Sequence, residues 1–360
     1  MAPSRWSPAT SVWAVTAAGV AWTVSAVLGL AAVPYAPIAS ADAGRLAVEQ
    51  ARSIAADVGQ ARAIDAAAAT DRFRSPSGGT LSGLRGKDVL VAFVESCGRV
   101  AVEGPASRGV QATLDAGTRR LQASGYAARS GYLTSPTFGG ASWLAHATLQ
   151  SGVWVDNGSS YTRLLSGTRA TLTRLFGGAG WRTVAVLPAD REPWPQGSAF
   201  YRFDAIYDSA GLGYAGPGFG WSTMPDQYVL RRFQQLELAR RDRPPVMAEI
   251  GLTSSHAPWA PLPTMLDWER LGNGSVYEAV HGRAQSADAL WKRPGEVRGA
   301  YLRSVEYSLT ALISFVERYG DDNLVLVLLG DHQPATIVTG SGASRDVPVT
   351  VVARDRAVLD

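Results

Sequence analysis

The amino-acid sequence predicts an α/β fold, with a mainly parallel sheet sandwiched by helices and one transmembrane helix before it. Two patterns carry this prediction. Over residues 85–360, short apolar runs of strand length alternate with segments of helical periodicity, and such alternation is typical of a parallel sheet covered on both faces. Upstream, no charged residue occurs from Trp6 to Ala41.

The composition excludes several classes of protein. With 46% hydrophobic and 18% charged residues, the chain is not an intrinsically disordered one. The net charge is only +3 and no basic block occurs, so we expect no nucleic-acid partner. A single cysteine, Cys97, excludes an internal disulfide and any paired-cysteine metal site.

The uncharged N-terminal stretch predicts a membrane anchor. After a short tail at residues 1–10, residues 11–33 form an apolar run long enough to span a bilayer as a helix. Arg5 precedes the run and Asp42 follows it, which predicts a cytoplasmic N-terminus and an extracytoplasmic C-terminal region. The alternative is a secretory signal peptide cleaved near Ala41, for which the run is long.

Residues 34–84 are predicted to join this anchor to the catalytic domain. The alanine-rich residues 42–72 favour a helical stem, and the serine- and glycine-rich residues 75–83 favour a linker. The catalytic domain is then expected over residues 85–360. The last apolar run ends near Asp360, where a further helix would be usual, so truncation of the domain at its C-terminus is left open.

Within residues 85–360, five runs read as buried strands and three segments as helices. The long helix has apolar residues at spacings of three and four, including Leu302, Val305 and Leu309. The glycine-, proline- and aromatic-rich residues 191–225 are expected to form an irregular insertion on the substrate side. The predicted strands are 88–95, 182–188, 245–252, 323–329 and 347–353, and the predicted helices are 107–123, 159–176 and 297–319.

Candidate metal ligands follow three of these strands. Glu95 ends the first, His256 comes shortly after the third, and Asp331 and His332 follow the fourth. Each residue alone could serve as a helix cap, but the carboxyl ends of parallel strands share one edge of the sheet. Carboxylate and imidazole ligands suit a divalent cation such as Zn²⁺ or Mn²⁺.

Ser142 is the candidate nucleophile. It follows Gly139-Gly140 at the expected start of a helix, where backbone N–H groups favour an anion, and a metal-activated hydroxyl there could attack phosphorus or sulfur. Alternatively, Ser142 only caps the helix. Thr137 is the second candidate. His146, one turn later, either supports the site or is packed in the interior.

Four segments, in this order, resemble the sulfatase-like branch of the alkaline phosphatase superfamily: VAFVESCGR, SPTFGGASWLAHATL, TSSHAPW and VLLGDHQP. The resemblance extends over residues 85–355 and is strongest to membrane-anchored actinobacterial sulfatase-family proteins, and more remote to lipoteichoic acid synthases. It implies an alkaline phosphatase-like fold and a divalent metal (Mn, Zn or Mg) held by Glu95, Ser142, Asp331 and His332. His256 is similar to a histidine that contacts the phosphoryl group in the synthases.

One sulfatase feature is missing. Sulfatases of the formylglycine type carry a Cys or Ser in the pattern C/S-x-P-x-R, whereas Cys97 is followed by Gly98-Arg99-Val100 and no Ser-x-Pro-x-Arg occurs. We therefore do not expect sulfate-ester hydrolysis by the formylglycine route.

Together, these features predict a membrane-anchored, metal-dependent hydrolase or transferase of phosphate or sulfate esters on cell-envelope or lipid-linked substrates. Ser142 would form a covalent intermediate, and His256 would orient the phosphoryl group or assist the leaving group. Two alternatives stay open. One is a non-catalytic cell-envelope scaffold, disabled by a missing C-terminal helix or by the residue at Cys97. The other is a secreted phosphatase or phosphodiesterase released by signal cleavage.

Overall fold

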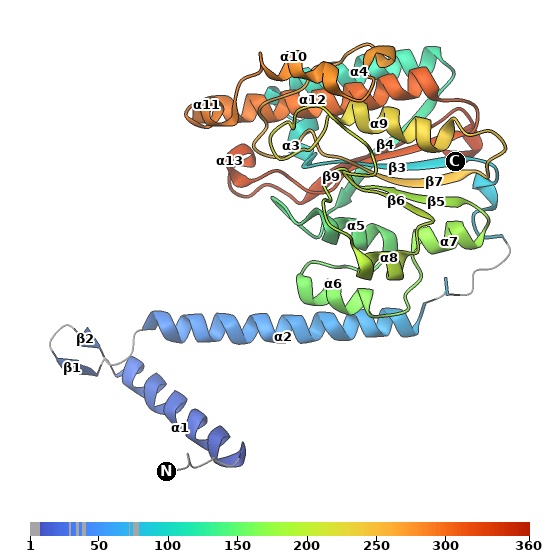
Figure 1. Ribbon diagram of the computed structural model, residues 1–360. Coiled ribbons are helices and arrows are strands. Elements are labelled where there is room, and N and C mark those ends of the chain that lie inside the picture. Colours follow the sequence, from blue (N-terminus) through green and yellow to red (C-terminus); the bar gives the residue numbers. More distant parts are fainter. Residues whose placement is uncertain (1–7, 29, 34–35, 38–40, 72, 75–78) are drawn as a thin grey trace. The chain divides into compact units, whose positions relative to one another are not determined.

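A computed structural model describes residues 8–28, 30–33, 36–37, 41–71, 73–74 and 79–360, which divide into two compact units, residues 1–65 and 66–360 (Figure 1). The first unit contains helix α1 (Pro8–Val27), a short antiparallel pair of strands, β1 (Ala31–Val33) and β2 (Ala36–Pro37), and most of helix α2 (Ala41–Ala69). Helix α2 corresponds to the predicted helical stem. Of the predicted linker, residues 75–78 lie outside the described residues.

The predicted transmembrane helix over residues 11–33 is not confirmed. Helix α1 ends at Val27, and residues 31–33 form strand β1, so the run is not one continuous helix. The sequence has Gly29 and Pro34 here, two poor helix formers. Among the helices of the described residues, none combines the length and the apolarity that crossing a bilayer requires.

The second unit is built around a seven-stranded sheet in the order β4-β9-β8-β3-β7-β5-β6. The pairs from β8 through β3, β7 and β5 to β6 are parallel, and β9 is antiparallel to both of its neighbours. This confirms the predicted mainly parallel sheet and places all five predicted strands in it. The strands are β3 (Asp88–Val94), β4 (Ala127–Thr134), β5 (Arg182–Val186), β6 (Ala205–Tyr207), β7 (Val246–Leu252), β8 (Leu324–Gly330) and β9 (Asp346–Ala353).

Helices cover both faces of this sheet (Figure 1). Alternate side chains of β3 point to opposite faces of the sheet, and both faces are covered. Leu90 and Val94 belong to one core cluster, and Val89 and Phe93 belong to another. The first cluster includes residues of α4 (Arg108–Ala123), α9 (Asp226–Phe233) and α12 (Pro294–Tyr319). The second includes residues of α5 (Ser142–Ser151) and α7 (Leu172–Gly178).

Several predicted elements need correction. The predicted helices 107–123 and 297–319 are confirmed as α4 and α12, but 159–176 is two helices, α6 (Gly158–Leu165) and α7. The break has a local cause, because the Thr171 side chain accepts a hydrogen bond from the backbone N–H of Arg174 and so starts a new helix. The supposedly irregular residues 191–225 contain α8 (Pro195–Tyr201) and β6.

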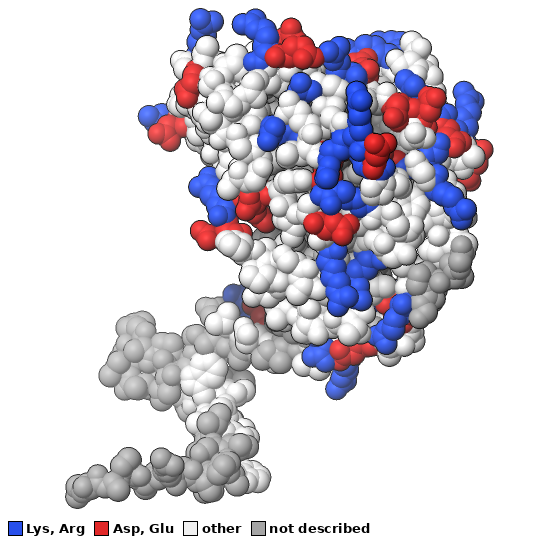
Figure 2. Space-filling model, turned by 45° about the vertical axis from the view of Figure 1, so that its right-hand side comes forward, with Lys and Arg blue, Asp and Glu red and all other residues white. Residues whose placement is uncertain are grey.

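Strand β4 was not predicted. It lies at the edge of the sheet, and seven of its eight residues are exposed, so its sequence lacks the apolar run that marks a buried strand. On the face of the molecule shown in Figure 2, basic and acidic side chains are interspersed over the second unit, so this face does not carry a single sign of charge.

Candidate functional site

The candidate site lies at the carboxyl edge of three neighbouring strands. Strand β3 pairs with β8 on one side and with β7 on the other, and all three are parallel. Glu95 directly follows β3, Asp331 and His332 directly follow β8, and His256 lies four residues after β7. The structure thus brings the strand-end residues singled out in the sequence to one edge of the sheet.

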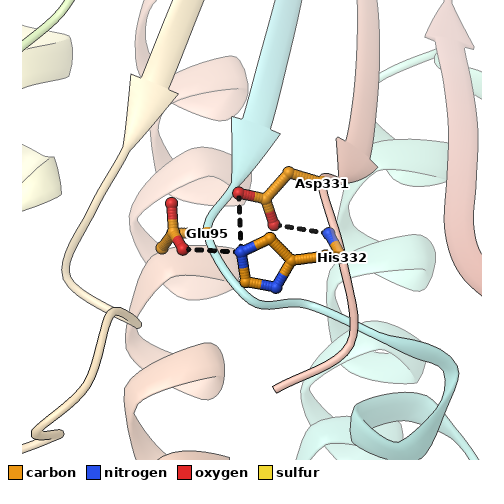
Figure 3. Close-up of side chains that lie close together, drawn as sticks. All are labelled: Glu95, Asp331 and His332. Atoms are coloured by element: carbon orange, nitrogen blue, oxygen red, sulfur yellow. Dashed lines mark hydrogen bonds and ion pairs between the residues drawn. The ribbon is translucent and has the colours of Figure 1, made fainter. Parts of the chain in front are cut away.

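Glu95, Asp331 and His332 form a buried cluster (Figure 3). Nε2 of His332 lies 3.2 Å from Oε1 of Glu95 and 3.8 Å from Oδ2 of Asp331. One donor atom from each residue lies within 4.8 Å of the others. Oδ1 of Asp331 is held by the backbone N–H groups of Ser96 and His332, both at 2.7 Å.

This cluster fits a divalent cation. Oδ2 of Asp331 is buried without a hydrogen-bond partner among the described residues, which is costly for a carboxylate oxygen unless an ion occupies the space beside it. Nδ1 of His332 lies 2.7 Å from the backbone carbonyl of Gln333, an arrangement that fixes the ring and leaves Nε2 toward the carboxylates. Two carboxylates and an imidazole suit Zn²⁺ or Mn²⁺.

Without a cation, the two buried carboxylates of the cluster repel each other. Burial and the negative charge of Glu95 raise the pKa of Asp331. Burial opposes the charged form of His332, but the carboxylates of Asp331 and Glu95 outweigh it and raise the pKa of His332 to about 9. Burial also acts to raise the pKa of Glu95, yet the hydrogen bond and charge of His332 hold it below its usual value. A bound cation would offset the repulsion between the two carboxylates.

Ser142 is the first residue of α5 and contacts this cluster. Its hydroxyl donates to Oε2 of Glu95 at 3.0 Å and lies 3.3 Å from Nε2 of His332. The N-cap position belongs to Ala141, and no side chain caps this helix. The role of Ser142 as a helix cap, left open by the sequence, is therefore not what the structure shows.

Tight backbone turns next to Ser142 and Glu95 position both residues at the site. Ala141 and Ser96 have φ values of 63° and 55°, in the left-handed region that costs a non-glycine residue about 1–2 kcal/mol. The strained Ser96 is held from both sides, because its N–H donates to Asp331 and its carbonyl accepts from the Tyr301 hydroxyl at 2.8 Å. Strain of this kind persists where surrounding contacts fix the backbone.

Thr137, the second candidate nucleophile, has other neighbours. It is buried, and its hydroxyl lies 3.4 Å from that of Ser135. Ser135 in turn donates to the backbone carbonyl of Asp331. Thr137 thus lies in the packing behind the β8 turn, whereas the Ser142 hydroxyl contacts Glu95 and His332 directly.

A cavity of about 700 Å³ opens beside Ser142. His256 lines it together with Glu95, Ser142 and Asp331. The His256 ring stacks on Trp221 with centroids 3.8 Å apart, and its Nδ1 contacts the backbone carbonyl of Ala257. The ring is therefore fixed in orientation, with Nε2 left for a ligand. Four further aromatic residues line the cavity: Tyr161, Trp194, Tyr201 and Phe203.

Glu249 is a cavity residue that the sequence reasoning missed. It lies in the middle of the buried strand β7, and its Oε1 is 2.8 Å from Nδ1 of His146. His146 also lines the cavity, and its ring stacks on Phe93 at 3.7 Å. The sequence did contain a signal: an acidic residue within the apolar run VMAEIGL must have a partner if the strand is buried on both faces.

Comparison with known proteins rests on structure. No family model matches the chain, and no curated protein matches its sequence. The lipoteichoic acid synthase LtaP from Listeria monocytogenes is 16% identical, with 79% of this chain and 70% of that chain covered at a TM-score of 0.51. Phosphoglycerol transferase GacH from Streptococcus pyogenes, in complex with sn-glycerol-1-phosphate, is 15% identical over 82% of this chain and 74% of its own (TM-score 0.48).

An alkaline phosphatase superfamily protein from Vibrio parahaemolyticus is 14% identical, with 82% of this chain and 68% of that chain covered at a TM-score of 0.47. The likeness to LtaP shows a shared fold. The fold expected from the sequence resemblance to lipoteichoic acid synthases is thereby confirmed.

Proposed function

We propose that the chain is a metal-dependent hydrolase or transferase of phosphate esters, with Ser142 as its nucleophile. One observation carries the proposal: the Ser142 hydroxyl lies 3.0 Å from Glu95 and 3.3 Å from His332, beside a buried group of three metal-ligating side chains. A hydroxyl next to a metal is the arrangement that nucleophilic catalysis of phosphoryl transfer requires.

The metal site of this proposal consists of Glu95, Asp331 and His332, with Ser142 as the fourth ligand. A Zn²⁺ or Mn²⁺ ion here would supply Lewis-acid stabilisation of negative charge on the phosphoryl oxygens. Oδ2 of Asp331, which has no hydrogen bond among the described residues, supports the site independently of the resemblance, because its position is explained by a cation.

The residues of the chain account for the covalent step. With a cation bound, the pKa of the Ser142 hydroxyl, which donates a hydrogen bond to Glu95, would be lowered and its proton lost to solvent. Oγ of Ser142 then attacks phosphorus as the bond from phosphorus to the leaving oxygen breaks, and the leaving oxygen takes up a proton. Nε2 of His256, fixed by Trp221, binds a phosphoryl oxygen. In the second step, water or an acceptor hydroxyl attacks phosphorus, and Ser142 regains its proton as the phosphorus–Oγ bond breaks.

Phosphate esters are favoured over sulfate esters for two reasons. The chain lacks the C/S-x-P-x-R pattern of formylglycine sulfatases. The fold is shared with a lipoteichoic acid synthase, and this likeness supports a cell-envelope or lipid-linked phosphodiester as substrate.

The test uses a chromogenic phosphodiester with the full chain loaded with Mn²⁺ or Zn²⁺. We expect Ser142→Ala and Asp331→Asn to lower kcat at least about 10³-fold, because each removes a group that acts on the reacting atoms. Thr137→Val is the matched control and should stay within about threefold of the wild type. Equal activity of Ser142→Ala and the wild type would refute the assignment, and a wild-type protein without activity or bound metal would favour the scaffold alternative.

The location of the protein is proposed from the sequence alone. The uncharged N-terminal stretch from Trp6 to Ala41 supports attachment to a bilayer and a catalytic unit outside the cytoplasm. Cell fractionation with N-terminal sequencing tests it. An intact N-terminus in the membrane fraction is expected, and a mature N-terminus near Asp42 would show a cleaved signal peptide instead.

A further inference from the structure

The cavity holds a second carboxylate–histidine pair, apart from the proposed metal ligands, in which Glu249 is buried and His146 partly buried. Nδ1 of His146 lies 2.8 Å from Oε1 of Glu249. Oε2 of the same carboxylate accepts a hydrogen bond from the Gln150 side chain, whose own carbonyl accepts from the backbone N–H and the hydroxyl of Thr173 at 3.1 and 3.0 Å. Each oxygen of Glu249 thus has its own donor, and the carboxylate is locked in place.

The hydrogen bond to Glu249 decides which nitrogen of the His146 ring can exchange its proton. Because Glu249 accepts from Nδ1, the exchangeable position is Nε2, as in the carboxylate–histidine pairs that serve acid–base catalysis. Stacking on Phe93, with centroids 3.7 Å apart, fixes the plane of the ring. Burial alone would lower the pKa of His146, but the hydrogen bond and charge of Glu249 outweigh it and raise the pKa.

The position of His146 in the fold also favours a catalytic role over a role in packing. His146 lies one helical turn after Ser142 on α5, and both line the same cavity. The aromatic residues Tyr161 and Trp194 line the same cavity. A group that is bound in this cavity beside α5 and reaches phosphorus on Ser142 would meet the imidazole of His146.

We propose that His146 is the catalytic acid and base for the alcohol that leaves and the alcohol or water that enters, and that Glu249 is its positioning residue. The inference rests on the proposed function of Ser142. In the first step, Nε2–H of protonated His146 gives its proton to the leaving oxygen as the phosphorus–oxygen bond breaks. In the second step, neutral Nε2 takes the proton of the acceptor hydroxyl as its oxygen bonds to phosphorus, which restores the starting state.

An activated substrate separates the two steps. A p-nitrophenyl phosphodiester releases a leaving group that needs no proton, so formation of the Ser142 adduct does not depend on His146, while attack by water still does. In His146→Gln we therefore expect a burst of about one equivalent of p-nitrophenolate, a steady-state rate at least about 100-fold below the wild type, and a phosphoryl adduct visible in the intact mass.

Glu249→Gln supplies a second variant. To keep the hydrogen bond from Gln150, its amide must turn its NH₂ group toward His146, which forces Nδ1 to accept and places the proton of the neutral ring on Nε2. That is the wrong tautomer for a base, so we expect the same burst and accumulated adduct. His281→Gln is the matched control, because this ring packs edge-on against Phe219, and should behave as the wild type.

The outcomes distinguish the two proposals. Accumulation of adduct also reports a folded site, since the first step has then occurred. An active wild type together with a His146→Gln variant that turns over at the wild-type rate without adduct overturns the role of His146 and leaves the function standing. If the first step of His146→Gln is slowed as much as its steady-state rate, so that no burst is seen, the proposed role of His146 is overturned as well. A wild type without phosphodiesterase activity overturns the proposed function and this inference with it.

Discussion

Asp331 shows at the scale of one residue how function and stability conflict in this site. Its carboxylate is buried beside that of Glu95, and its Oδ2 has no hydrogen-bond partner among the described residues. Burial of like charges is unfavourable unless a cation or proton compensates. The buried carboxylate of Asp331 is thus explained by metal binding and not by a contribution to the stability of the fold.

Asp331→Asn tests this view. The amide oxygen can still accept from the backbone N–H groups of Ser96 and His332, while the repulsion with Glu95 disappears. We expect the metal-free variant to be more stable than the metal-free wild type by about 1–2 kcal/mol at pH 8, and to lose metal binding. Urea denaturation in a chelator measures the first effect, and metal analysis measures the second. Exposed Asp115→Asn serves as control, and a metal-free Asp331→Asn less stable than the wild type contradicts the account.

At the scale of elements, a buried ion pair ties the end of α9 to the sheet. The π-helical turn Gln234–Leu238 carries Glu237, whose side chain is fully buried. Its carboxylate accepts two hydrogen bonds from Arg182 on β5, at 2.6 and 2.8 Å, and one from Tyr207 on β6 at 2.6 Å. Burial acts against the charged form, but these partners outweigh it and lower the pKa of Glu237.

We expect Glu237→Gln to destabilise the protein by about 2 kcal/mol at pH 7, because it leaves the partly buried guanidinium of Arg182 without its counter-ion. A lowered pKa in the folded state contributes stability that is full above the unfolded value of about 4.3 and is lost as the pH falls through the folded value. The difference between wild type and variant should therefore shrink below pH 4. Denaturation curves from pH 3 to 7 measure it. A difference independent of pH would contradict the assignment, and surface Glu296→Gln should change stability by less than about 1 kcal/mol.

The sequence predicted elements best where burial leaves a pattern. The central strands and the long helix α12 have runs or stripes of apolar residues, and the strand ends then placed Glu95, His256, Asp331 and His332 together. The edge strand β4 is largely exposed and leaves no such run. The break between α6 and α7 depends on a local cap at Thr171. Glu249 was missed because its partner, His146, comes from another element, and such pairing across the fold is invisible to periodicity.

At the scale of the whole molecule, a metal ion should couple the ends of β3 and β8 and so stabilise the second unit. Binding to the folded state alone adds about 2.7 kcal/mol when the free metal is at one hundred times its dissociation constant. We expect Zn²⁺ or Mn²⁺ to raise Tm by several degrees, and a chelator to reverse the change. Glu95→Gln should not respond. A rise in Tm of equal size in Glu95→Gln would place the metal elsewhere.

The central claim is that Ser142 attacks phosphorus. The most direct measurement is to quench the full chain during turnover of a phosphodiester and to map the adduct by peptide mass spectrometry. The account predicts a phosphoryl adduct on Ser142 that requires added metal, that disappears in Ser142→Ala, and that accumulates in His146→Gln. An adduct on Thr137, or continued turnover by Ser142→Ala, would contradict it.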